Sequence, residues 1–132
     1  MSLLGRAEVT PYNAQVELSD VDAQEYPQWL TGNEAVVSLP NSIAVATQGD
    51  DRGKVVVEAW SGELEADDSD LSQPMFDGEF STTRGMANIG NTVGNELHSI
   101  VLSLGRHRIR VYTSPAGEPP ARVYFLLNHL PA

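Results

Sequence analysis

Residues 97–113, LHSIVLSLGRHRIRVYT, contain two strand-like runs, 97–104 and 107–113, on either side of Gly105–Arg106. The second run alternates apolar and polar side chains with a period of two, which is typical of half-buried β-strands. A two-residue turn that contains glycine is a common hairpin connection. The stretch therefore predicts a β-hairpin, and ARVYFLLNHL at 121–130 predicts a third strand that completes an antiparallel meander.

Short strand-like runs also occur throughout the rest of the chain. In KVVVEAW, alternation places Val55, Val57 and Ala59 on one face of a strand, and GELEA at 62–66 is its expected partner across a turn at 61–62. Val16 and Leu18 alternate with polar residues in the same way. The further strand candidates are NAQVELS (13–19), EAVVSLP (34–40), NSIAVATQ (41–48) and DGEFSTT (77–83).

Helix signals are weak. The one helical candidate is DVDAQEYPQWL at 20–30, where Pro27 limits a helix to a turn or two. The chain has 11 glycines and 8 prolines among 132 residues, a composition suited to many turns between short strands. The sequence predicts an all-β fold, an antiparallel β-sandwich or partly open barrel of about 8–9 strands. We expect residues 1–132 to form a single domain.

The charge is strongly acidic and unevenly distributed. The whole chain has 8 Lys and Arg against 18 Asp and Glu, a formal net charge of −10. Residues 1–96 contain 4 of these basic and 17 of the acidic residues, a net charge of −13, whereas residues 97–132 contain 4 basic and 1 acidic, a net charge of +3. A chain of this charge repels nucleic-acid phosphates and anionic lipids, so we expect neither nucleic acid nor membrane as a partner.

The absence of cysteine excludes disulfides, thiolate metal sites and cysteine catalysis. No apolar run reaches the roughly 20 residues that a membrane-spanning helix needs. The opening MSLLGRAEV is too short for the core of a signal peptide, and MSL is assigned no role. These observations predict a cytoplasmic protein.

The basic cluster GRHRIRVYTS at 105–114 is the first candidate site. On a strand from 107 to 113, Ile109 and Val111 face the core, so Arg108, Arg110 and Tyr112 face solvent. Arg122 lies on the corresponding face of the next strand. The favoured interpretation is that these arginines pair with acidic neighbours on a solvated sheet face. The alternative is a patch that binds an anionic ligand or an acidic partner surface, since Arg and Tyr are frequent in interface hot spots.

The acidic segment ELEADDSDLSQPMFDGE, at 63–79, is the second candidate. Its central carboxylates Asp67, Asp68 and Asp70 are candidate contacts to a basic partner. If Asp68 is counted as position 1 of a calcium-binding loop, residues with side-chain oxygen atoms stand at positions 1, 3, 5 and 12, the last of which is Glu79. Position 6, where such a loop requires glycine, holds glutamine. We therefore assign no metal site and expect a solvated acidic loop.

Catalytic signatures are absent from the sequence. The histidines at 98, 107 and 129 have no metal-ligand spacing, and the predicted hairpin places His107 opposite Leu104 and His98 opposite Thr113. No Gly-x-Ser-x-Gly elbow, phosphate-binding loop or dinucleotide fingerprint occurs. The sequence therefore predicts no catalytic residue, no enzymatic activity and no cofactor.

Several segments share their order and pattern with one protein family. Tyr12, Gln15 and Leu18 fit a Tyr-x-x-Gln-x-x-Leu opening, and Val45 and Thr47 fit a following Val-x-Val-x-Thr strand that leads into an acidic turn. The matching segments are YNAQVELSD (12–20), IAVATQGDDRGKVVVEAW (43–60), LHSIVLSLGRHRIRVY (97–112) and YFLLNHLPA (124–132). In these features the chain resembles small bacterial proteins of the competence protein J type, many of which are uncharacterised. Residues 63–95 do not match.

The resemblance implies a β-sandwich and, from competence protein J, inhibition of a partner nuclease. It brings no catalytic residues. An acidic protein suits such a role because it presents carboxylates where a nuclease expects phosphates. We therefore expect a non-catalytic module that binds a basic protein such as a nuclease or toxin. The alternative is a module that binds a small ligand or a divalent cation. The oligomeric state is left open.

Overall fold

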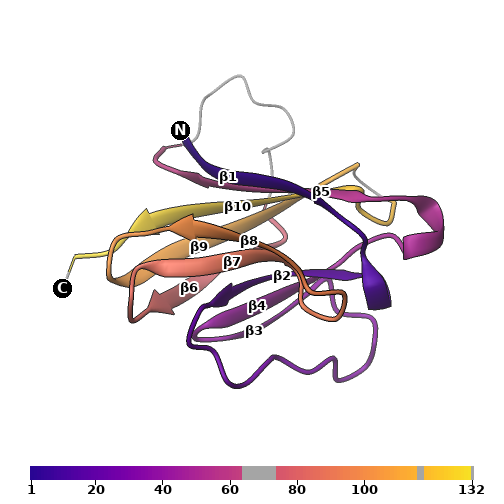
Figure 1. The fold of residues 1–132 in the computed structure, drawn as a ribbon, viewed down its shortest axis with the longest axis horizontal. Coiled ribbons are helices and arrows are strands. Elements are labelled where there is room, and N and C mark those ends of the chain that lie inside the picture. The colour runs from indigo at the N-terminus through magenta and orange to yellow at the C-terminus, as the bar shows by residue number, and fades with distance from the viewer. Residues whose placement is uncertain (64–73, 116–117, 132) are drawn as a thin grey trace.

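Two β-sheets make up the part of the chain that the computed structural model describes, residues 1–63, 74–115 and 118–131. In sheet A the strand order is β1 (Ser2–Val9), β5 (Val55–Ser61), β10 (Arg122–His129), β9 (Gly105–Ser114) and β6 (Phe76–Thr82). In sheet B it is β3 (Val36–Leu39), β4 (Ser42–Ala46), β2 (Gln15–Asp20), β7 (Met86–Asn91) and β8 (Glu96–Val101). Figure 1 shows both chain ends at one end of the molecule.

The two sheets enclose one apolar core. Alternate residues of each strand point inward, as the sequence predicts for Val55, Val57 and Ala59, which are fully buried. The largest buried side chains of the core come from both sheets: Leu18, Ile43, Ile89 and Ile100 from sheet B, and Phe80, Ile109 and Phe125 from sheet A. The sheets are not closed into a barrel, so the predicted all-β sandwich is confirmed, with ten strands in the described residues.

The predicted hairpin at Gly105–Arg106 is wrong, although both of its strands exist. β8 pairs with β7 in sheet B, whereas β9 pairs with β6 and β10 in sheet A. The connection between them passes from one sheet to the other, and β9 begins at Gly105, where φ is +100°. Alternation could not reveal this, because Ile100 and Ile109 face the same core in either arrangement. Only β9 and β10 form the antiparallel pair that the meander predicted.

The predicted partner of β5 is also wrong. β1 pairs with β5 in antiparallel fashion on one side, and β10 pairs with it in parallel on the other, so no edge is left for GELEA. Of that segment, Gly62 and Glu63 are not in a strand, and residues 64–66 lie outside the described residues. The N-terminal MSL has a structural role, since β1 begins at Ser2 and Met1 packs against the apolar cluster of Tyr112, Tyr124 and Leu126.

Residues 21–35 form a long irregular connection rather than the predicted helical turn. Short 3-10 turns form instead at η1 (Tyr12–Ala14) and η2 (Asp50–Arg52), which lie together at the end of the molecule opposite the chain ends (Figure 1). Pro27 and the preceding residue prefer extended backbone, which prevents a helix. No helix in the described residues is long and apolar enough to cross a membrane.

Candidate protein-binding surfaces

The arginines of β9 lie on the outer face of sheet A, as predicted, and two of them pair with carboxylates of β6. Arg108 contacts Asp77 at 2.6 Å, and Arg106 contacts Glu79 at 3.2 Å. The hydrogen bond from Arg108 lowers the pKa of Asp77, and the same bond raises the pKa of Arg108. Of the arginines for which acidic neighbours were expected, Arg108 has one in Asp77.

The prediction that Tyr112 stands in solvent is wrong. Its side chain is 1% exposed and packs with Tyr124 and Leu126 of β10, and the partly buried Trp60 and Met1 extend this outer cluster. Aromatic rings on facing strands bury large apolar areas against one another, which favours this arrangement over exposure. Tyr112 is therefore not a surface residue of the outer face.

The other two arginines predicted to bind a partner also contact neighbours on this face. The Arg110 Nη2 atom donates to the Asn128 Oδ1 atom at 3.0 Å, and its buried Nε atom has no partner. Arg122 is exposed and donates to the Tyr124 hydroxyl at 3.4 Å. Arg108 and Arg122 thus remain accessible, while Arg110 is half-buried. A role of these residues in binding stays a prediction.

The acidic candidates divide between described and undescribed residues. Asp67, Asp68 and Asp70 lie outside the described residues, so their proposed contact to a partner stays a prediction. Asp77 and Glu79, from the same segment, are engaged with the β9 arginines. Within the described residues, no group of three His, Asp or Glu side chains is arranged to hold a metal ion.

The predicted positions of His107 opposite Leu104 and of His98 opposite Thr113 are wrong, because β8 and β9 lie in different sheets. His107 and His129 are cross-strand neighbours with ring centroids 5.3 Å apart, because β9 pairs with β10 and not with β8. Burial lowers the pKa of His107, whose Nε2 atom lies 2.8 Å from the Ser103 carbonyl oxygen. His129 similarly contacts the carbonyl of Leu104 at 2.8 Å. Both rings thus fasten the connection that crosses between the sheets.

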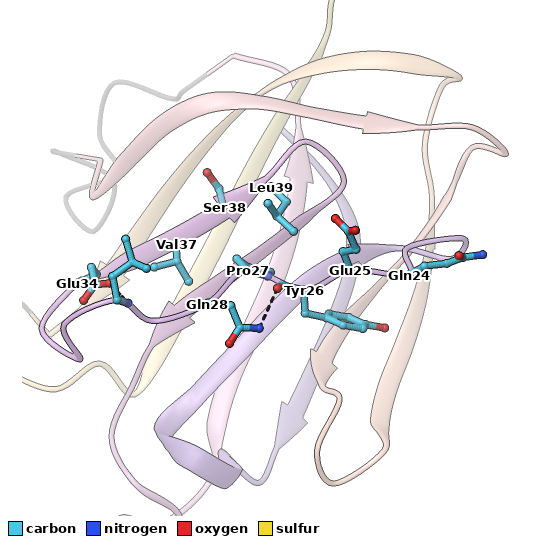
Figure 2. Close-up of a pocket in the computed structure, with 10 residues that line it drawn as sticks. Gln24, Glu25, Tyr26, Pro27, Gln28, Glu34, Val37, Ser38 and Leu39 are labelled. Carbon is cyan, nitrogen blue, oxygen red and sulfur yellow. Dashed lines mark hydrogen bonds between the residues drawn. The ribbon is translucent and has the colours of Figure 1, made fainter.

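A shallow pocket that the sequence analysis missed lies between β3 and the connection 21–35. We call it the β3 pocket; it has a volume of about 810 Å³, and Figure 2 shows its walls. The residues that line it are Gln24, Glu25, Tyr26, Pro27, Gln28, Leu30, Glu34, Val37, Ser38 and Leu39. A second hollow of about 390 Å³ adjoins it at Ser38 and Leu39 and reaches β6. The sequence feature that could have pointed to this pocket is the long connection 21–35, since irregular loops of this length are often functional.

Hydrogen bonds hold the wall of the β3 pocket in place. The Trp29 Nε1 atom donates to the Gln15 Oε1 atom at 2.9 Å, which ties the connection to β2. The Glu34 carboxylate accepts from the backbone nitrogens of Leu30 at 2.6 Å and Thr31 at 3.1 Å, and from the Thr31 hydroxyl. The Thr31 and Leu30 bonds lower the pKa of Glu34 to about 2. Glu34 is therefore ionised at neutral pH.

The β3 pocket combines apolar surface with negative charge. Leu30 is 88% exposed and Tyr26 is 43% exposed, so both present apolar surface to solvent. Figure 2 shows Val37 and Leu39 between Glu34 at one end of the pocket and Glu25 toward the other. No Lys, Arg or His is among the described residues that line it. This surface suits a ligand with both apolar and cationic groups.

One buried carboxyl group, that of Glu17, lies on the outer face of sheet B. Glu17 of β2 is 4% exposed, and the backbone nitrogen of Thr92 donates to its Oε1 atom at 3.1 Å. Its Oε2 atom has no hydrogen-bond partner, and burial raises the pKa of this carboxyl. Alternation places Glu17 opposite Val16 and Leu18 and so predicts a solvent-facing side chain, which the structure contradicts.

Comparison with known proteins gives a match in structure but not in sequence. No protein-family model matches the chain, and no curated protein matches it. The fold is similar to the crystal structure of ComJ from Bacillus subtilis, described as an inhibitor of the DNA-degrading activity of NucA. The TM-score is 0.77, with 98% of each chain covered and 13% sequence identity. This similarity agrees with the resemblance in the sequence and shows a common fold.

Proposed function

We propose that this protein is a non-catalytic, cytoplasmic binding module that binds and inhibits a basic protein such as a nuclease or toxin. The observation that carries the proposal is the similarity to ComJ, which extends over 98% of both chains, so the whole fold corresponds rather than one motif. Because a fold alone does not fix a function, the identity of the partner is not transferred from ComJ.

The charge of the chain supports a basic partner. A net charge of −10 on 132 residues creates a negative potential that attracts basic proteins and accelerates their association. The active sites of nucleases are adapted to the phosphates of nucleic acids, so carboxylates at the right positions compete for the same basic groups. Such binding should weaken as the salt concentration rises, because salt screens exposed charges.

Among the residues that the structure describes, the perturbed ionisable groups have structural explanations and do not gather at one site. They belong to four separate segments: Glu17 is buried in β2, Glu34 caps the turn before β3, Asp77 pairs with Arg108, and His107 is buried in β9. Active sites usually concentrate such groups in one cleft. Their dispersion supports a binding role over catalysis.

The direct test is capture of a partner from a lysate of the source organism at low and at high salt, with this protein as bait. We expect one basic protein that is retained at low salt and released at high salt, and inhibition of its activity by the purified bait. A triple variant, D67N, D68N and D70N, should weaken the complex. The control D50N, D51N and E118Q removes the same number of charges elsewhere. Absence of a retained protein at both salts would contradict the proposal.

A further inference from the structure

We propose that the β3 pocket is a second contact surface for the basic partner, besides Asp67, Asp68 and Asp70, and that it takes an extended segment of the partner in which arginine and aliphatic side chains alternate. This inference rests on the proposed binding function and specifies where else that binding occurs. The pocket consists entirely of described residues, and it offers apolar contacts and uncompensated negative charge in one place.

The negative charge of the β3 pocket differs from that of the ion-paired carboxylates Asp77, Glu79 and Asp22, because no cation of the described residues opposes it. Asp77, Glu79 and Asp22 each have an arginine within 3.2 Å. Glu25 has no hydrogen bond or ion pair with any residue that the structure describes, so its carboxylate is free to accept one. The Glu34 carboxylate accepts hydrogen bonds from the turn 30–33, and it keeps its negative charge. A guanidinium group would therefore be bound at Glu25 and attracted by both carboxylates.

The apolar part of the β3 pocket indicates that the bound segment also contains aliphatic side chains. Val37 and Leu39 project from β3, with Pro27 of the connection 21–35 beside them (Figure 2). Leu30 of the same connection also lines the pocket. The exposed ring of Tyr26 is available to stack on a guanidinium or on an aliphatic stem. Aliphatic residues next to arginine would cover Leu30, which solvent otherwise surrounds. An anionic ligand is disfavoured by both carboxylates, and a second copy of this chain by its net charge of −10.

The experiment is a nuclear magnetic resonance titration of the full chain with an acetylated, amidated hexapeptide of alternating arginine and leucine. We expect the largest amide shift changes at residues 24–39. E25Q should weaken peptide binding by about fivefold or more, whereas D51N, which removes an equal charge from η2, should weaken it by less than about twofold. Equal losses in E25Q and D51N, or shift changes spread over the acidic surface, would overturn the inference.

A second pair of variants separates the apolar contribution from the charge. L30A should weaken binding at both low and high salt, while the effect of E25Q should shrink at high salt. V101A, which shortens another exposed aliphatic side chain on β8, is the matched control and should leave the affinity unchanged. A peptide of arginine and serine should bind more weakly than the arginine–leucine peptide. Equal affinity for the two peptides would contradict the apolar contact.

The two proposals fail in different ways. If a basic partner is captured but E25Q and L30A bind it as the unmodified chain does, the function stands and the assignment to the β3 pocket is wrong. If the peptide binds at residues 24–39 but no partner is captured and inhibited, the pocket is supported and the inhibitory function is contradicted.

Discussion

The outer faces of the two sheets differ in whether their charged side chains have partners. On sheet A, Arg106 and Arg108 are matched with carboxylates of β6, and Tyr112 is sealed into an apolar cluster. On sheet B, Glu17 keeps a buried oxygen atom without a partner, and Glu25 lies in an apolar pocket without a cation. The arginines that stand out in the sequence are therefore mostly paired with carboxylates. Glu25, by contrast, has no cationic partner among the described residues, and Glu17 is buried at a cost in free energy.

The largest expected effect tests the sealed cluster on sheet A. Tyr112→Ala should lower the free energy of unfolding by about 3 kcal/mol, because it leaves a cavity between Tyr124 and Leu126. Tyr26→Ala, on the exposed wall of the β3 pocket, should change it by no more than about 0.5 kcal/mol. Urea denaturation measures both. Equal losses in the two variants would mean that the two tyrosines do not differ in burial.

A second test concerns the buried carboxyl on sheet B. Burial raises the pKa of Glu17 in the folded protein above 4.5, its ordinary value. Its contribution to stability is therefore fully present below pH 4.5 and is lost as the pH rises through the folded pKa. Glu17→Gln should make the protein more stable than the unmodified chain at pH 7 but not at pH 4. A stability difference that is the same at both pH values would contradict this account.

The smallest expected effect concerns the matched charges on sheet A. Arg108→Ala should raise the pKa of Asp77 toward 3.8, its ordinary value, because the hydrogen bond from Arg108 is the main cause of the lowering. Carbon-13 shifts of the Asp77 carboxyl group would follow this titration. Arg106→Ala is the control, since it removes the partner of Glu79 and leaves the Arg108 bond intact. The pair is exposed, so both variants should fold and melt almost as the unmodified chain does.

Much of the fold could be predicted, but the site could not. The runs around Val55, Ile109 and Phe125 predicted strands, and alternation correctly grouped the residues that share a face and placed Ile109 toward the core. The runs 34–40 and 41–48 predicted two strands, and β3 and β4 lie within them. The β3 pocket was missed because its two walls come from an irregular connection and an edge strand, whose spatial relation no local pattern encodes.

Local patterns also misjudged individual side chains. Glu17 and Tyr112 occupy outward positions of their strands, yet both are buried by neighbours on the outer faces. Alternation tells which side of a strand a residue is on, but it does not tell whether something else covers that side. The His107–His129 contact was missed for a related reason, because it depends on the register between β9 and β10, which alternation within one strand does not fix.

The sequence by itself determined that this protein is an acidic, all-β sandwich, because period-two alternation and frequent turn residues are properties of short segments. Only the tertiary structure decided which sheet each strand joins, which arginines meet a carboxylate and which glutamates do not. The physical reason is distance along the chain. Strand partners, ion pairs and pocket walls are made by residues tens of positions apart, whose contacts depend on the packing of the whole core.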